Sequence, residues 1–274
     1  MTSIKSTPVG TEKEFGYEWH AYSEILPKHR EQFWTWIQPL QPTDFAGKRF
    51  LDAGCGMGRN SYWAMDAGAA SAYAFDFDQR TVAAAKRNLS AFPSCTVGYQ
   101  SIYDLDRPDE FDIVFCIGVL HHLANPRRAV ENLVRAAKPG GKVAVWVYGK
   151  EGNRVYLAFL RPLRFLTKRI PIGLTRILAR ALTAIFRLVL LVAPETAYRK
   201  LLRSLSFSHV EAIVFDQLFP SIANYWSREE ALGLFAGLPV ILRSMTFTYG
   251  HSWTIVIEKS PSTVFASPQP GFPL

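Results

Sequence analysis

The sequence predicts an α/β fold: a doubly wound, mainly parallel sheet of seven strands, with an N-terminal helical lid and a helical insertion before the last β-hairpin. Short apolar runs alternate with helical stretches from Lys48 to Tyr148, the pattern of parallel strands joined by helices on both faces. Two later apolar runs, joined by Gly250 and His251, predict an antiparallel hairpin that completes the sheet. The 274 residues, 49% hydrophobic and 20% charged, indicate a globular protein and exclude collagen, low-complexity and disulfide-scaffold classes.

The elements of the sheet follow from apolar runs and from helix-breaking residues. Helices are expected at 60–66, 79–89, 127–138 and 228–236, and Gly68 stops the first of them. Pro139, Gly140 and Gly141 are expected to stop the third helix and to turn the chain into the fifth strand. The seven expected strands are 49–53, 72–76, 96–100, 111–117, 142–148, 241–249 and 252–258.

Five parts are expected along the chain. They are an aromatic helical lid (1–46), the sheet-forming core (47–148), a basic amphipathic helical insertion (149–207), the part that completes the sheet (208–260) and a tail rich in Pro and Ser (261–274). In the first part, aromatic and charged residues from Phe15 to Leu40 predict one or two amphipathic helices ended by Pro39 and Pro42. We expect this part to act as a lid or a brace.

The N-terminal residues and the cysteines indicate a cytoplasmic protein. The first 19 residues are polar and lack the apolar run of about 7 to 15 residues that a secretory signal requires. Cys55, Cys95 and Cys116 lie far apart, without metal-ligand spacing, and their odd number suits a reducing compartment. We therefore expect no metal site.

The positive charge of the chain is local. The net charge is +8, but the segment from Arg154 to Arg203 carries eleven Lys and Arg against the single acid Glu195. Its longest uncharged run, Leu188 to Pro194, is too short to span a bilayer, which needs about 20 apolar residues. The charges suit an acidic substrate or an anionic membrane surface, or else they form the solvated side of cover helices. We expect no nucleic acid partner, because no dedicated binding module is evident.

A glycine-rich turn carries the clearest functional signal. In the sequence LDAGCGMGR, Gly54, Gly56 and Gly58 stand between an expected strand and an expected helix. Glycine takes backbone angles that other residues resist and lets the backbone approach a ligand closely. A dinucleotide site would need a further glycine where Arg59 stands, and a P-loop would need Gly-Lys-Ser/Thr. Asp76 ends the second expected strand, where an acid can accept both hydroxyls of a ribose.

Together these features resemble the class I S-adenosylmethionine (SAM) dependent methyltransferases, of the bacterial small-molecule type. The resemblance covers about residues 48–148 and rests on LDAGCGMGR, Asp76, FDIVFCIGVLHHL and LVRAAKPGGKVAVWVY. FGYEW before the core and FDQLFPSIANYWSREEALGLFAGL before the last hairpin are also similar to stretches in bacterial members. The resemblance implies a Rossmann-like fold, SAM as the cofactor and methyl transfer to a small molecule.

The same resemblance implies where SAM is held. Asp52 and the backbone from Gly54 through Cys55 and Gly56 to Gly58 would hold the methionine part, Asp76 the ribose, and Phe77 would pack on the adenine. Many members have an aspartate facing the adenine amino group where this chain has Ser101, followed by Ile102, so Gln100 or Asp104 could serve instead. Ile117 and Gly118 would lie beside the donor, and His121 and His122 would edge the active cleft.

Two kinds of residue are candidates for catalysis. A histidine such as His121 could remove the proton of a hydroxyl acceptor, although a structural role beside the cofactor is the alternative. An aromatic face attracts a cation such as a sulfonium, and Tyr17 and Tyr148 come from segments that could meet over it. Asn153 and Tyr156 follow directly after the fifth strand and complete the candidate set.

Three functions are compatible with these residues. The first is methyl transfer from SAM to a small-molecule acceptor. The second keeps SAM but lets its own amine attack its γ-carbon, forming azetidine-2-carboxylate and methylthioadenosine within a cage of Tyr17, Tyr148, Asn153 and Tyr156. The third is a non-catalytic SAM-binding protein that associates with anionic membranes. Peripheral membrane contact through 154–203 and a homodimer both stay open.

Overall fold

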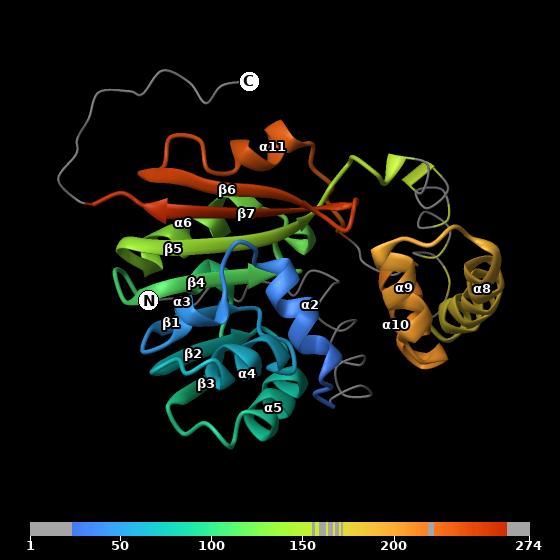
Figure 1. The fold of residues 1–274 in the computed structure, drawn as a ribbon, viewed down its shortest axis with the longest axis horizontal. Coiled ribbons are helices and arrows are strands. Elements are labelled where there is room, and N and C mark those ends of the chain that lie inside the picture. The colour runs from blue at the N-terminus through green and yellow to red at the C-terminus, as the bar shows by residue number, and fades with distance from the viewer. Residues whose placement is uncertain are drawn as a thin grey trace.

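A seven-stranded sheet is the centre of the computed structural model, which describes residues 24–154, 157–158, 163, 167, 170, 172–218 and 222–261. The strands are β1 Arg49–Ala53, β2 Ser71–Asp76, β3 Cys95–Tyr99, β4 Phe111–Ile117, β5 Ala137–Tyr148, β6 Val240–Thr248 and β7 Ser252–Lys259. Their order is β3-β2-β1-β4-β5-β7-β6, and only β7 runs antiparallel to the other strands (Figure 1). The expected fold class is confirmed.

Helices cover both faces of the sheet (Figure 1). One face carries α6 (Pro126–Ala136) and α11 (Arg228–Gly233), and the other carries α2 (Lys28–Trp36), α4 (Arg59–Asp66) and α5 (Gln79–Asn88). Successive strand residues serve opposite faces: Phe115 packs with the α2 and α4 side, and Cys116 packs with the α6 side. Because β4 is buried on both faces, its sequence FDIVFCI is almost continuously apolar. Short elements complete this part of the chain: α3 (Pro42–Phe45), η1 (Ile102–Asp104) and η2 (Leu120–His122).

The described part of the N-terminal region is a brace on the sheet. Phe33 and Trp36 of α2 are buried in the core, and the Trp36 ring lies 5.1 Å from that of Trp146 on β5. Phe33 also packs at 5.4 Å from Phe115 of β4. Phe33 and Trp36, two of the aromatic residues behind the lid prediction, therefore anchor α2 across the central strands. Residues 1–23 lie outside the described residues.

The expected turn at Pro139–Gly141 is wrong in one respect: these residues lie inside β5, and α6 ends earlier, at Ala136. Phe111 pairs with Ala137, but Ile113 pairs with Lys142, so β5 bulges beside β4. Gly140 takes a φ of 76°, and a Cβ at Gly141 would lie 2.8 Å from the carbonyl oxygen of Lys138. The glycines thus let the chain stay paired with β4 through the bulge instead of leaving the sheet.

The insertion forms a helical lobe beside the carboxyl ends of the parallel strands (Figure 1). It contains α8 (Ile172–Val192), α9 (Ala197–Ser204) and α10 (Phe207–Leu218), and α8 packs on α10 around Ala179 and Leu218. The helices therefore continue past residue 207, where we expected the insertion to end. Among the described helices, none is long and apolar enough to cross a membrane.

The insertion leaves and rejoins the sheet at neighbouring points. Gly149 and Trp226 form a parallel β-bridge. The backbone nitrogen of Trp226 donates to the carbonyl of Tyr148 at 3.1 Å, and that of Lys150 donates to the carbonyl of Trp226 at 2.8 Å. The two ends of the insertion are therefore hydrogen-bonded to each other.

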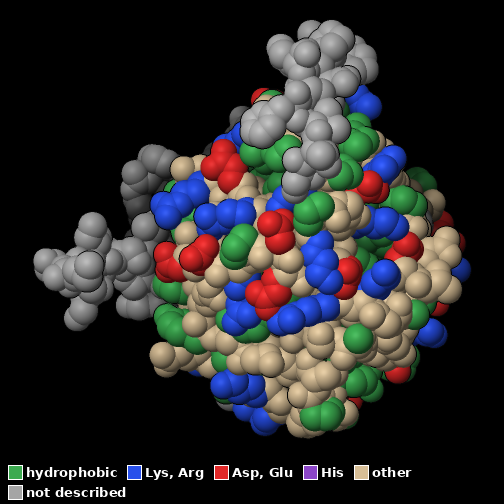
Figure 2. Space-filling view, turned by 90° about the vertical axis from the view of Figure 1, so that its left-hand side faces the viewer, with side chains coloured by type: hydrophobic (Ala, Val, Ile, Leu, Met, Phe, Trp, Pro, Cys, Tyr) green, Lys and Arg blue, Asp and Glu red, His purple; other side chains and the backbone are tan. Residues whose placement is uncertain are grey.

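The opposite end of the sheet has a mixed-charge surface. Figure 2 shows this face, where Lys and Arg alternate with Asp and Glu. Ion pairs join Lys138 to Asp112 at 2.8 Å and Lys259 to Asp109 at 2.6 Å. Exposed pairs of this kind contribute little stability, about 0 to 1 kcal/mol each. The part of this surface that is visible in Figure 2 carries no large patch of one sign.

Candidate functional site

The glycine turn follows β1 and leads into α4. Gly54, Gly56 and Gly58 all have positive φ, at 83°, 53° and 85°. A Cβ at Gly54 would lie 2.3 Å from a methyl of Val119, and one at Gly58 would lie 2.9 Å from Leu89. Both the backbone angles and the space therefore require glycine at these two positions. The expected strand-turn-helix context of the motif is present.

Backbone and side-chain hydrogen bonds fix the turn against β2. The backbone nitrogens of Gly54 and Cys55 both donate to the carbonyl of Phe75 at 2.9 Å. The Asn88 amide donates to the carbonyl of Met57 at 2.9 Å. The Cys55 thiol is buried, and burial raises its pKa well above the usual value, so Cys55 is suited to contribute its backbone rather than a thiolate.

Asp52, the penultimate residue of β1, has a buried carboxylate with one unsatisfied oxygen. Its Oδ2 accepts a hydrogen bond from the Ser61 hydroxyl at 2.6 Å, while its Oδ1 is buried without a hydrogen-bond partner among the described residues. Burial, followed by the nearby charge of Asp76, raises the pKa of Asp52 to about 7 despite the Ser61 bond. A buried carboxylate in this state is suited to a cationic ligand, which would lower its pKa again.

Asp76, the last residue of β2, braces the turn. Its Oδ2 accepts from the backbone nitrogen of Gly56 at 3.0 Å, and its Oδ1 accepts from that of Asp78 at 3.1 Å. Burial raises the pKa of Asp76 to about 6, although both hydrogen bonds lower it. A carboxylate can accept about four hydrogen bonds, so these two contacts leave acceptor capacity for a pair of hydroxyls.

Phe77 lies next to Asp76 and is paired with an aromatic residue that the sequence analysis missed. Its ring is stacked on Tyr99 with 5.5 Å between centroids and 9° between planes. Tyr99 ends β3 directly beside Asp76 in the sheet register and is half exposed. The β-register brings these two rings together, and no spacing in the sequence signals the pair.

Ser101 and its neighbours have structural partners. The Ser101 hydroxyl accepts from the backbone nitrogen of Tyr103 at 3.2 Å and caps η1, and Ile102 is buried. Gln100 accepts from the Tyr73 hydroxyl at 2.8 Å and donates to the carbonyl of Asp104 at 2.9 Å. Both the oxygen and the nitrogen of the Gln100 side chain are thus hydrogen-bonded within the protein. The exposed Asp104 carboxylate stays a candidate for the amino group of the adenine.

Ile117 and Gly118 lie at the carboxyl end of β4. Ile117 is buried, and Gly118 has a φ of 80°. A Cβ at Gly118 would meet no atom within 4 Å, so this turn borders open space. The position fits the predicted place beside the donor.

Three rings form a column above the carboxyl ends of β4 and β5. His121 is stacked on Tyr148, with centroids 3.7 Å apart, and Tyr148 is stacked on Tyr225 at 5.3 Å. His121 is completely buried, which favours a structural role over that of a proton acceptor. Tyr225 lies far from Tyr148 in the sequence, and the return of the insertion to the sheet at Trp226 brings the two rings together.

The segment around Tyr225 is fixed to the turn after β4. The backbone nitrogen of Asn224 donates to the carbonyl of His121 at 2.8 Å, and its side chain donates to the carbonyl of Leu123 at 3.0 Å. His122 Nδ1 lies 2.9 Å from the carbonyl oxygen of Ile222. A carbonyl only accepts, so Nδ1 carries the proton of this contact, and Nε2 is the basic nitrogen of the neutral ring.

Of the remaining catalytic candidates, Asn153 is described, and its side chain is bonded elsewhere. The Asn153 amide donates to the carbonyls of Gly149 at 2.8 Å and His251 at 2.7 Å, so both of its protons are used to join the insertion to the last hairpin. Tyr17 and Tyr156 lie outside the described residues.

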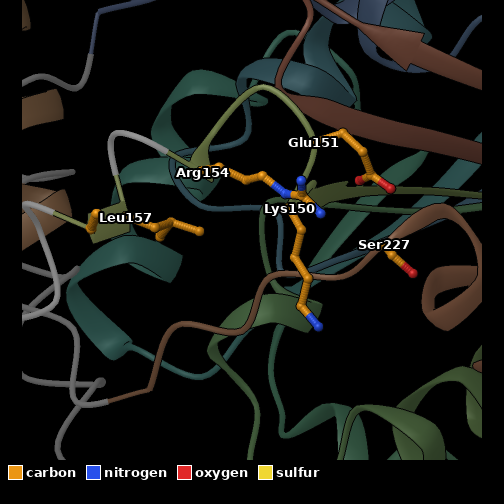
Figure 3. A pocket seen from close by; sticks show the side chains of 6 residues that line it. Lys150, Glu151, Arg154, Leu157 and Ser227 are labelled. Carbon is orange, nitrogen blue, oxygen red and sulfur yellow. The ribbon is translucent and has the colours of Figure 1, made fainter.

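A cavity of about 260 Å³ lies at the root of the insertion (Figure 3). It is lined by Lys150, Glu151, Arg154, Leu157, Ala158 and Ser227. Two charged side chains of its wall have partners: Lys150 binds Glu230, and Glu151 accepts from the Trp253 indole at 3.1 Å. None of these lining residues belongs to the predicted site, and we assign the cavity no ligand.

Comparison with known proteins identifies the core. Residues 51–145 match the family model described as a methyltransferase domain. The match runs from β1 through the glycine turn and Asp76 to β5. The chain carries a class I SAM-dependent methyltransferase domain. SAM is the cofactor of this domain, and the unsatisfied oxygen of Asp52, the glycine turn and Asp76 fit its cationic methionine part and its ribose.

Curated relatives of the methyltransferase domain include ubiquinone biosynthesis O-methyltransferases. The chain is 28% identical over 183 residues to the one from Thiobacillus denitrificans, covering 63% of this chain and 75% of that protein. It is 34% identical over 135 residues to the one from Dechloromonas aromatica, covering 46% and 55%. An uncharacterised protein of Synechococcus is 34% identical over 132 residues, but the match spans only 32% of its length.

Solved structures share the fold over most of the chain. A chain from the Haloferax volcanii complex of the Trm112 methyltransferase activator with a methyltransferase has a TM-score of 0.57 and 15% identity, covering 93% of this chain and 99% of that one. Magnesium protoporphyrin IX methyltransferase from Synechocystis has a TM-score of 0.53 and 14% identity, covering 93% and 90%. At such identities these structures show the fold alone.

Proposed function

We propose that the chain is an enzyme that transfers the methyl group of SAM to a hydroxyl of a small-molecule acceptor in the cytoplasm. The donor half of the proposal rests on Asp52: its buried, unsatisfied oxygen lies near the end of β1, just before the glycine turn that Asp76 braces. The hydroxyl acceptor is supported by the similarity to proteins named ubiquinone biosynthesis O-methyltransferases. Three free cysteines support a reducing compartment.

The residues of the donor half bind and orient. Asp52 holds positive charge, Asp76 accepts from the ribose hydroxyls while keeping Gly56 in place, and Phe77 and Tyr99 offer parallel ring faces to the adenine. SAM, when bound, supplies a methyl group on a sulfonium. The thioether that remains after the transfer is a good leaving group. The main task of the protein is therefore to align donor and acceptor.

His122 is our choice for the residue that takes the acceptor proton. It follows β4 at the open turn of Gly118, and the contact of Nδ1 with Ile222 fixes Nε2 as its basic nitrogen. Its ring is only partly buried, whereas His121 is completely buried and stacked on Tyr148. An imidazole with a pKa near 6.5 suits a general base at neutral pH.

The experiment is to incubate the purified chain with SAM, first alone and then with a small-molecule extract of cells, and to resolve the nucleoside products by mass spectrometry. We expect S-adenosylhomocysteine only with extract, together with an acceptor heavier by one methylene. Methylthioadenosine formed without extract would show that the reaction is the internal displacement within SAM and not methyl transfer. SAM binding without any product in either sample would instead support the non-catalytic alternative.

A further inference from the structure

Helix α8 has large apolar side chains on its exposed face as well as on its packed face. Its buried positions include Thr175, Ala179, Thr183 and Leu190, and Leu182 packs against the same cluster as Ala179. Seven further large apolar residues of the helix are exposed: Leu174, Ile177, Ile185, Leu188, Val189, Leu191 and Val192. A helix that only covers the lobe would carry mostly polar side chains on its outer face. The exposed face of α8 is therefore built to contact something other than water.

These exposed residues form one continuous stripe. Leu174, Ile177, Ile185, Leu188 and Val192 recur at helical spacing, with Ala181 between them, and each of the five is between 54% and 86% exposed. At 1.5 Å per residue the stripe is roughly 27 Å long. Single exposed apolar residues are ordinary, but a contiguous patch of this kind marks an interaction site.

Positive charges lie beside the stripe. Arg176 and Arg180 are both exposed and stand one turn apart along one side of it, and α8 contains no acidic residue. Farther along the lobe, Arg187 and Arg203 donate to backbone carbonyls at the ends of α9 and α8 and so add positive charge to the same lobe. Glu195 is the single acid between residues 154 and 203.

We infer that α8 docks on an anionic membrane surface, with its apolar stripe in the lipid and Arg176 and Arg180 at the phosphate level. An apolar face bordered by arginines is the composition of a helix that lies in the plane of the interface. Consistent with this orientation, α8 is not apolar enough to cross the bilayer. This inference does not depend on the reaction proposed above.

Charge decides between a membrane and a second copy of the chain. A symmetric contact between two α8 helices would cover the same stripe, but it would bring two sets of arginines together without a neighbouring acid in α8. Like charges at such a contact oppose association. Anionic lipids neutralise the same arginines, so the surface is complementary to a membrane and not to itself.

The test is co-sedimentation of the full chain with phosphatidylcholine vesicles that contain or lack phosphatidylglycerol. We expect binding to the anionic vesicles that weakens as the salt concentration rises to about 1 M, where the Debye length falls to about 3 Å. Binding to the neutral vesicles should be at least tenfold weaker, because the arginines then lack anionic partners.

Two sets of variants test the apolar stripe and the arginines of α8 separately. Leu188→Gln should weaken binding to anionic vesicles by about tenfold, because it replaces an inserted apolar side chain with a polar one. Ile241→Gln changes an exposed apolar residue of β6 and is the matched control, which should bind as the unmodified chain does. Arg176→Gln combined with Arg180→Gln should also weaken binding about tenfold, whereas Lys86→Gln combined with Arg87→Gln on α5 should not.

Circular dichroism and SAM affinity report whether each variant is folded, and the changed side chains on α8 are exposed. The inference is overturned if the folded Leu188→Gln variant binds as tightly as the unmodified chain. It is also overturned if the unmodified chain ignores anionic vesicles. A dimer in solution that Leu188→Gln converts to a monomer, without any vesicle binding, would assign the stripe to a second copy instead.

Discussion

The Asp76 carboxylate accepts the backbone N–H of Gly56 across a distance of 3.0 Å. This contact joins the end of β2 to the middle of the glycine turn. The same carboxylate keeps acceptor capacity for the ribose. Asp76 therefore braces the turn, and in the proposed SAM site the same side chain also binds the ribose.

Asp76→Asn should raise the dissociation constant for SAM by at least tenfold. The amide cannot accept from both Gly56 and Asp78, and hydrogen bonds to a charged acceptor contribute about 1.5 to 3 kcal/mol each. Isothermal titration calorimetry measures the change. Asp66→Asn, at an exposed position of α4, is the control and should bind normally. Unaltered affinity in Asp76→Asn would remove Asp76 from the site.

SAM affinity should rise with pH between about 6 and 8 in the unmodified chain. The pKa of Asp52 is raised to about 7, so the carboxyl is largely protonated at pH 6 and must ionise to bind a cation. Asp52→Asn should bind more weakly and lose this pH dependence. The Asp52→Asn variant is also the control for protonation of SAM itself, because that effect would be the same for both proteins.

The raised pKa of Asp52 also affects stability, in the opposite direction. The folded chain keeps a proton that the unfolded chain releases near pH 3.8, so the free energy of unfolding should fall as pH rises from about 4 to 7. Denaturant unfolding of the chain and of Asp52→Asn at several pH values measures the difference. Parallel pH profiles for the two proteins would contradict the raised pKa.

Gly54→Ala should destabilise the chain by more than Gly237→Ala. Both glycines have positive φ, which costs roughly 1 to 2 kcal/mol for alanine. The Cβ at Gly54 would also lie 2.3 Å from Val119, whereas the one at Gly237 would meet no atom within 4 Å. Comparing the two free energies of unfolding isolates the steric part. Adding Val119→Ala to Gly54→Ala should recover part of the loss.

His122→Gln should lower the rate of methyl transfer about 10² to 10⁴-fold at neutral pH and leave SAM affinity unchanged. The loss should shrink as pH rises, because solvent hydroxide then replaces the missing base. His121→Gln is the comparison: His121 is stacked on Tyr148, so its replacement should reduce stability as well as rate. A normal pH profile in His122→Gln would exclude His122 as the base.

Asn153→Ala should reduce stability by about 1 to 3 kcal/mol, because it removes two hydrogen bonds and leaves the carbonyls of Gly149 and His251 without this donor. Thermal unfolding measures the loss. If Asn153 instead belonged to a cage around the sulfonium, its replacement would weaken SAM binding without the loss of stability.

The sequence predicted best where local chemistry decides the structure. The bounds of β1 and β4, the glycine turn and the place of Asp76 follow from apolar runs and from backbone angles that only glycine takes easily. Side-chain pairs between neighbouring strands could not be predicted from the sequence. The Phe77–Tyr99 stack, for example, depends on the register of β2 and β3. Tyr225 joins His121 and Tyr148 only because the insertion returns to the sheet at Trp226.

The bulge at Pro139–Gly141 and the helix α10 show two further limits of local patterns. The Pro-Gly-Gly sequence is a strong turn signal, yet pairing with β4 keeps it within a strand. The insertion continues to Leu218 because α10 has α8 to pack against, a contact with no counterpart in the spacing of residues. In both cases tertiary contacts override the local preference.

The bridge between Gly149 and Trp226 marks the boundary between the sheet and the helical lobe. Both ends of the insertion meet at this bridge, so the sheet closes in the same way whatever the length of the segment between them. Even doubling the length of a flexible connection adds only about 0.6 kcal/mol to the entropic cost of closing the loop. Replacing the helical lobe at this bridge would therefore leave the strands and the glycine turn of the sheet in place.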